Sequence, residues 1–85
     1  MKYSIYITRD DEEPLFLQAS NDLARLTSCN SVSVTRWVNE MSADPDLFHS
    51  NNSSLTVLED GELILQRDNA FRSGRWISNQ PKETT

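Results

Sequence analysis

The dipeptide Asp60-Gly61 is the feature that most constrains the fold of this chain. It separates two mostly apolar runs, residues 55–59 and 62–66. A two-residue turn between antiparallel strands needs positive φ at both central residues, and Asp-Gly adopts this conformation readily. The sequence therefore predicts a β-hairpin over residues 55–66, with a type I′ turn at its tip.

The N-terminal residues predict a second hairpin. Tyr3, Ile5 and Ile7 alternate with polar or less apolar positions, which is the period-two pattern of a half-buried strand over residues 2–8. The charged run 9–14 ends in a proline and indicates a turn, after which residues 15–18 form a short second strand.

From Ser20 onward the apolar spacing changes to that of helices. Leu23, Leu26 and Thr27 share one face of a short first helix. Its candidate N-caps are Ser20 and Asn21, with Asp22 in the first turn.

A second helix is predicted after a polar break at residues 28–30. Its core-facing stripe is Val34, Trp37, Val38 and Met41, and its N-cap is Asn30 or Ser31. Residues 42–54 then predict a loop in which Leu47 and Phe48 attach a helical turn to the core.

These elements predict an α+β fold, in which the two hairpins form one small antiparallel sheet packed on the helix pair. We expect a single compact domain over residues 1–78 and a frayed tail over residues 79–85. The residues that we expect to be buried are Ile5, Ile7, Leu23, Val34, Trp37, Val57 and Leu65.

Composition narrows the classes of function. The net charge of −5 and the pI near 4.6 argue against a protein that coats nucleic acid or anionic membranes nonspecifically. Cys29 is the only cysteine, so it forms no internal disulfide, and the N-terminus shows no apolar leader. No apolar run approaches the roughly 18 residues that span a bilayer. We expect a cytoplasmic protein.

Residues 20–38 fit the pattern of a helix-turn-helix motif without a gap, and residues 23–37 carry its characteristic positions. Ala24 takes the small-residue position, and Leu23, Cys29, Val34 and Trp37 take the apolar positions. This string resembles the bihelical unit of phage-repressor and resolvase-like DNA-binding domains, and the motif region, residues 20–38, covers about a quarter of the chain. Ser28 stands where the motif usually has a turn glycine, which often has positive φ.

The resemblance implies a small DNA-binding regulator of the kind that phages and other mobile elements carry, whose second helix lies in the major groove of double-stranded DNA. The outward residues of that helix would then face base edges: Ser31, Val32, Ser33 and Arg36. Arg25 would contact a phosphate, and two copies of the chain would pair to read two half-sites. In the alternative reading, the same helix pair is only scaffold or contacts protein.

The C-terminal part differs in charge from the rest of the chain. Residues 67–85 carry four basic and two acidic residues, a net +2, whereas residues 1–66 carry four and eleven, a net −7. Within it, Arg72, Arg75 and Trp76 alternate cations and aromatic rings as surfaces that bind nucleic acid do. The alternative is that Phe71 and Trp76 fold back onto the core.

The excess negative charge supports a second function class, an acidic adaptor or inhibitor that docks on a basic partner protein by mimicking DNA. Its acidic face would comprise residues 10–13 with Asp44, Asp46, Glu59, Asp60 and Glu62. We expect no enzyme, metal or cofactor, because the only histidine, His49, has no sequence context that joins it to Cys29 or to an acid.

Overall fold

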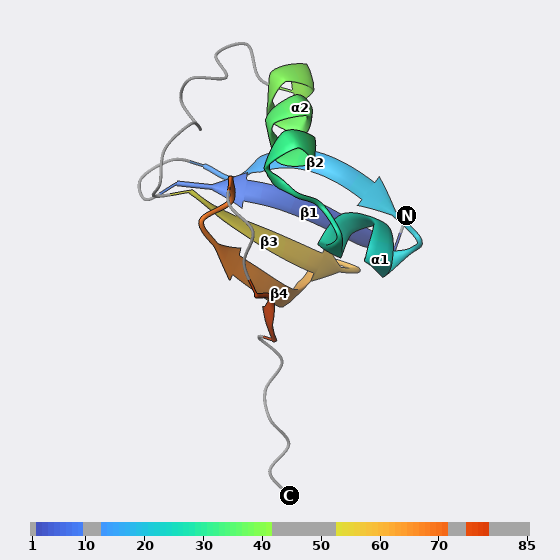
Figure 1. Cartoon of the computed structure of the whole chain (residues 1–85). Helices are drawn as coiled ribbons and strands as arrows, with labels where there is room; N and C mark the ends of the chain where they lie inside the picture. The colour runs from blue at the N-terminus through green and yellow to red at the C-terminus, as the bar shows by residue number, and fades with distance from the viewer. Residues whose placement is uncertain (1, 10–12, 42–52, 72–74, 79–85) are drawn as a thin grey trace, which may run out of the picture.

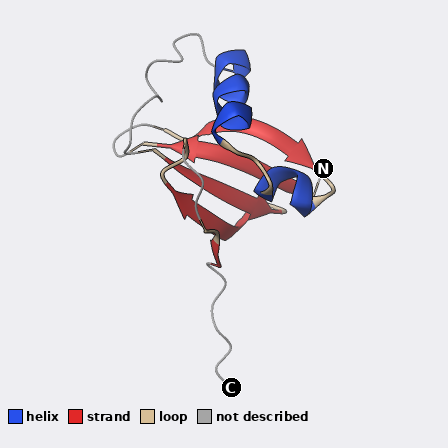
Figure 2. Ribbon diagram, viewed as in Figure 1, coloured by secondary structure: helices blue, strands red, loops and turns tan. Residues whose placement is uncertain are grey.

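The computed structural model describes residues 2–9, 13–41, 53–71 and 75–78. Within these residues the chain order is β1 (Tyr3–Thr8), β2 (Leu15–Ser20), α1 (Leu23–Thr27), α2 (Ser31–Met41), β3 (Ser54–Glu59), β4 (Glu62–Asp68) and β5 (Ile77–Ser78). The described strands form one antiparallel sheet in the order β2-β1-β3-β4-β5 (Figure 1). Both helices pack on the sheet (Figure 2), so the predicted α+β fold is confirmed.

The two predicted hairpins are present and are joined by pairing between β1 and β3. At the tip of the β3–β4 hairpin, Asp60 and Gly61 have φ of 52° and 87°, as the type I′ prediction requires. Strand β2 continues to Ser20, two residues past its predicted end, because Ala19 and Ser20 pair with Ser4 and Tyr3.

The helix caps differ in part from the expected ones. The N-cap of α1 is Asp22, whose carboxylate accepts a hydrogen bond from the Ala24 backbone N–H, and neither Ser20 nor Asn21 takes this position. Ser20 belongs to β2, and its hydroxyl accepts from the Asp22 N–H. At the start of α2, the Asn30 side chain accepts from the Ser33 N–H, so Asn30 rather than Ser31 makes this capping bond.

The core lies between the helices and one face of the sheet. Its fully buried side chains include Ile5, Ile7, Val34 and Val57, four of the seven predicted. The other three predicted core residues, Leu23, Trp37 and Leu65, are only half-buried at its margin. Leu23 begins α1, Trp37 borders a surface cleft, and Leu65 lies beside the two-residue edge strand β5. Met41 was expected in the core-facing stripe, but it ends α2 and is exposed.

Several predictions fall outside the described residues: the loop over residues 42–52 with Leu47 and Phe48, and the tail over residues 79–85. In the part of the chain that the structure describes, no helix has the length and apolar character needed to cross a bilayer.

Candidate nucleic-acid interface

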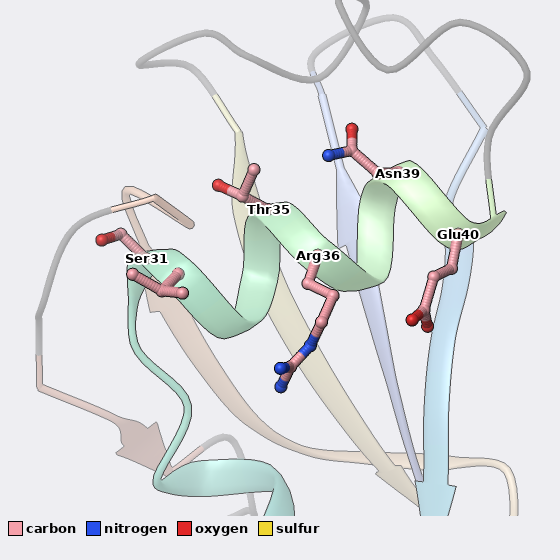
Figure 3. A pocket seen from close by; sticks show the side chains of 6 residues that line it. Ser31, Thr35, Arg36, Asn39 and Glu40 are labelled. Carbon is pink, nitrogen blue, oxygen red and sulfur yellow. The ribbon is translucent and has the colours of Figure 1, made fainter.

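Helix α2 is held against β2 by its inner side and presents its other side outward. Val34 and Val38 are fully buried in the core. The outward side borders a shallow groove of about 490 Å³, lined by Ser31, Val32, Thr35, Arg36, Asn39 and Glu40. In Figure 3, Arg36 and Glu40 extend from the same side of the helix, and Thr35 and Asn39 lie on another side.

The outward side of α2 has the chemistry needed to read base edges. Arg36 can donate two parallel hydrogen bonds to guanine, Asn39 can pair with adenine, and Val32 can contact a thymine methyl group. Val32 is 70% exposed although it is apolar, so it is free to make such a contact. Among the described residues that line this groove, Glu40 is the one acidic group.

A second cavity, which we call the arginine cleft, lies where α1, α2 and the end of β2 meet. Its volume is about 360 Å³. It is lined by Gln18, Ala19, Ser20, Arg25, Leu26, Ser28, Ser33, Arg36 and Trp37. Arg25 comes from α1 and Arg36 from α2, so two separate elements place guanidinium groups on one cavity.

The arginine cleft has two cationic residues in its lining, Arg25 and Arg36, in a chain whose net charge is −5. None of the described residues that line it is acidic. The ion pair found among the described residues joins Lys2 Nζ to Glu59 Oε2 at 3.2 Å, and neither Arg25 nor Arg36 is paired within that part of the chain.

Hydroxyl groups complete the lining of the cleft. Ser20 Oγ accepts from the Asp22 N–H at 3.0 Å, which leaves its own proton to donate. Ser33 Oγ is 3.3 Å from Asn30 Oδ1 and donates to it. Ser28 has φ of −89°, so the turn between the helices is unstrained without the glycine that the motif usually has, and the cost expected at this position is absent.

Arg67, which is buried at 2% exposure, holds the turn between the helices from the side of the core. Its Nη1 donates to the Cys29 carbonyl and its Nη2 to the Ala70 carbonyl, both at 3.2 Å. The guanidinium carbon also lies 5.1 Å from the centre of the Trp76 ring, a cation–π distance. Sequence reasoning counted Arg67 only as C-terminal positive charge and did not predict its burial.

Trp76 is part of this anchor. Its indole Nε1 donates to the Thr27 carbonyl at 2.8 Å, which ties the segment before β5 to the end of α1. Phe71 and Trp76 both pack against the core, in line with the fold-back alternative. Arg75 is exposed, and Arg72 lies outside the described residues, so a nucleic-acid role for this segment stays a prediction.

The structure brings together most of the residues that the motif resemblance singled out. Arg25, Ser33 and Arg36 line the arginine cleft, and Ser31, Val32 and Arg36 line the groove on α2. Arg36 borders both cavities. Sequence reasoning missed Gln18, Ser20 and Ser28, because nothing local indicates that the end of β2 lies beside the helices.

The helix-turn-helix resemblance itself stays a prediction. The helices follow in the expected order with a three-residue turn, and Cys29 is buried there at 8% exposure. However, α1 has five residues and packs on β1 and β2, and α2 packs on β2. The sheet, more than a partner helix, supports each of them.

The described part of the predicted acidic face is small. Glu13 is exposed before β2, Asp60 and Glu62 are exposed at the tip of the β3–β4 hairpin, and Glu59 is paired with Lys2. Residues 10–12, Asp44 and Asp46 lie outside the described residues.

Comparison with known proteins returned no match: no family model, no curated protein and no solved structure is significantly similar to this chain.

Proposed function

We propose that this chain is a small DNA-binding regulator that places α2 in the major groove and holds a backbone phosphate in the arginine cleft. One observation carries the proposal: two arginines from different helices line a single cavity, and among the described residues neither has an ion-pair partner and none that lines the cavity is acidic, in a chain of net charge −5. Basic residues gathered in one place on an acidic protein indicate a local anion site.

The dimensions of the surface agree with this proposal. Eleven residues of α2 extend about 16 Å, and the major groove is about 12 Å wide and admits one helix. Arg36 borders both the groove on α2 and the arginine cleft. A DNA duplex that contacts the outward side of α2 would therefore bring its sugar-phosphate backbone to the arginine cleft. Val34 and Val38 hold the helix rigidly on the sheet, which limits the entropy lost on binding.

The test is a titration of a labelled duplex followed by fluorescence anisotropy at several salt concentrations. Wild type should bind random sequence with a dissociation constant of roughly 10⁻⁴ to 10⁻⁶ M that weakens as salt rises. Arg25→Gln should weaken all sequences alike and lower the slope of log K against log salt by about 0.9, because one phosphate contact is lost. Arg36→Gln should weaken binding and also change base preference.

Arg9→Gln is the matched control. Arg9→Gln removes the same charge just after β1. The other end of β1 is the one near the cleft, because Tyr3, six residues earlier, pairs with Ser20. The affinity and salt slope of this control should equal those of wild type. No binding at low salt, or equal losses in all three variants, would contradict the proposal.

A double substitution at the hairpin tip distinguishes DNA binding from the alternative function, an acidic adaptor that docks on a basic protein. Asp60→Asn with Glu62→Gln removes two exposed charges from the hairpin tip, remote in sequence from the cleft. If the chain binds DNA, this variant should bind at least as tightly as wild type, because repulsion of phosphate falls. If it docks on a basic protein, the complex should weaken in this variant and survive Arg36→Gln.

A further inference from the structure

The sheet face turned away from the helices carries an uncharged row that crosses every described strand. The strand registers align Phe16 with Tyr6, Tyr6 with Thr56, Thr56 with Gln66, and Gln66 with Ile77. Tyr6 and Phe16 pack edge to face, with ring centres 5.6 Å apart. We call this surface the outer face.

Neighbouring rows extend the outer face without adding much charge. Ala19, Ser4, Leu58 and Leu63 form one row, and Thr8, Ser54 and Asp68 form another. Among these described positions only Asp68 is charged at neutral pH, although a quarter of the chain is charged. A sheet face that meets water is normally polar, yet Phe16, Leu63 and Ile77 are 37%, 38% and 55% exposed.

We propose that the outer face is the surface through which two copies of this chain associate. The described outer-face rows hold no cation, so nucleic acid or an acidic partner would find no counter-charge there. Two copies of net charge −5 repel each other, and the described outer-face rows would bring only Asp68 of each copy into the contact as a like charge. A two-fold interface brings the same surface of both copies together, and an uncharged surface can do so without repelling its copy.

The area available sets the strength of this association. Four strands about 20 Å long and about 4.8 Å apart, to which the two-residue β5 adds little, give a face of roughly 400 Å² on each copy. A stable interface buries about 800 Å² on each partner, and weak encounters bury less. The dimer should therefore be weak and concentration-dependent, with two sheets packed about 10 Å apart.

This inference is independent of DNA binding, since the helices pack on the opposite face of the sheet. The core side chains Ile5 and Val57 lie on the helix side, and Tyr6, Thr56 and Leu58 alternate with them. The dimer leaves α2 and the arginine cleft of each copy exposed.

Sedimentation velocity of the full chain from micromolar to millimolar concentration tests the proposal. Wild type should change from monomer to dimer across this range. Phe16→Glu and Ile77→Glu should each stay monomeric, because every dimer would bury two new carboxylates. Circular dichroism checks that each variant is folded, and Ile77, at 55% exposure on the edge strand, is the change least able to disturb the fold.

Val32→Glu is the matched control, because it places the same charge on an exposed apolar residue of α2, away from the outer face. It should dimerise as wild type does. A wild-type monomer at millimolar concentration would overturn the proposal. So would a dimer that survives both outer-face changes or disappears in Val32→Glu.

Discussion

At the scale of single residues, Arg67 shows how a cation can hold this fold together without an acidic partner. Its fork of donors satisfies two carbonyls from the helix turn and from the segment after β4, and its flat face lies against Trp76. Its Nε is buried without a partner among the described residues. The two carbonyl bonds and the ring contact must therefore offset its desolvation.

Arg67→Lys keeps the charge and tests this role. One ammonium group cannot reproduce the fork that joins Cys29 O and Ala70 O, so one carbonyl should lose its partner. We expect the free energy of unfolding in urea to fall by about 1–3 kcal/mol. Arg9→Lys should change it by less than about 0.5 kcal/mol, and an equal effect of the two substitutions would contradict the anchoring role.

Cys29 makes stability depend on alkaline pH. Burial raises the pKa of its thiol, and the nearby Arg67 only partly opposes this. As pH rises past the ordinary thiol value, about 8.5, the unfolded chain releases its proton first, so the folded state loses stability until the raised pKa is passed. Urea midpoints between about pH 7 and 10 should therefore fall more steeply for wild type than for Cys29→Ala. Parallel curves would show that the thiol does not contribute.

At the scale of elements, the β3–β4 hairpin depends on Gly61. Its φ is 87°, and an added Cβ would meet no atom within 4 Å, so Gly61→Ala introduces backbone strain alone. We expect a loss of about 1 kcal/mol in thermal or urea unfolding. Asp60→Asn, at φ of 52°, should be nearly neutral because asparagine tolerates this conformation. A neutral Gly61→Ala would show that the turn can relax to another type.

Elements set by local chemistry could be predicted from the sequence, and elements set by distant partners could not. The Asp60-Gly61 turn and the alternation of Ile5 and Ile7 are local, and both predictions are confirmed. Strand β5 has two residues and exists through pairing with Leu65 and Gln66, so no pattern of its own could indicate it. The register shifts in the β1–β2 and β3–β4 pairs are likewise invisible in one strand alone.

At the scale of the whole molecule, part of the candidate site could be predicted from the sequence, namely the helix residues, and part could not, namely the residues at the end of β2. Arg25 and Arg36 were singled out because the motif spacing places them outward. The contribution of Gln18 and Ser20 depends on how the end of β2 meets both helices, which is a property of the folded chain. The same holds for Trp76, whose bond to Thr27 spans 49 residues of sequence.

These long-range contacts make the C-terminal segment part of the domain. A chain that ends at Gln66 loses the bonds of Arg67, the Trp76 bond to Thr27, and the buried Ala70 with its backbone bond to Ser53. Each hydrogen bond contributes about 1 kcal/mol, and an 85-residue domain has only about 4–13 kcal/mol in total. We expect the chain ending at Gln66 to show no cooperative thermal transition by circular dichroism, and a chain ending at Ser78 to retain one. A cooperative transition in the shorter chain would mean that β1 to β4 and the helices fold without this segment. The contacts of the segment would then contribute little to the stability of the domain.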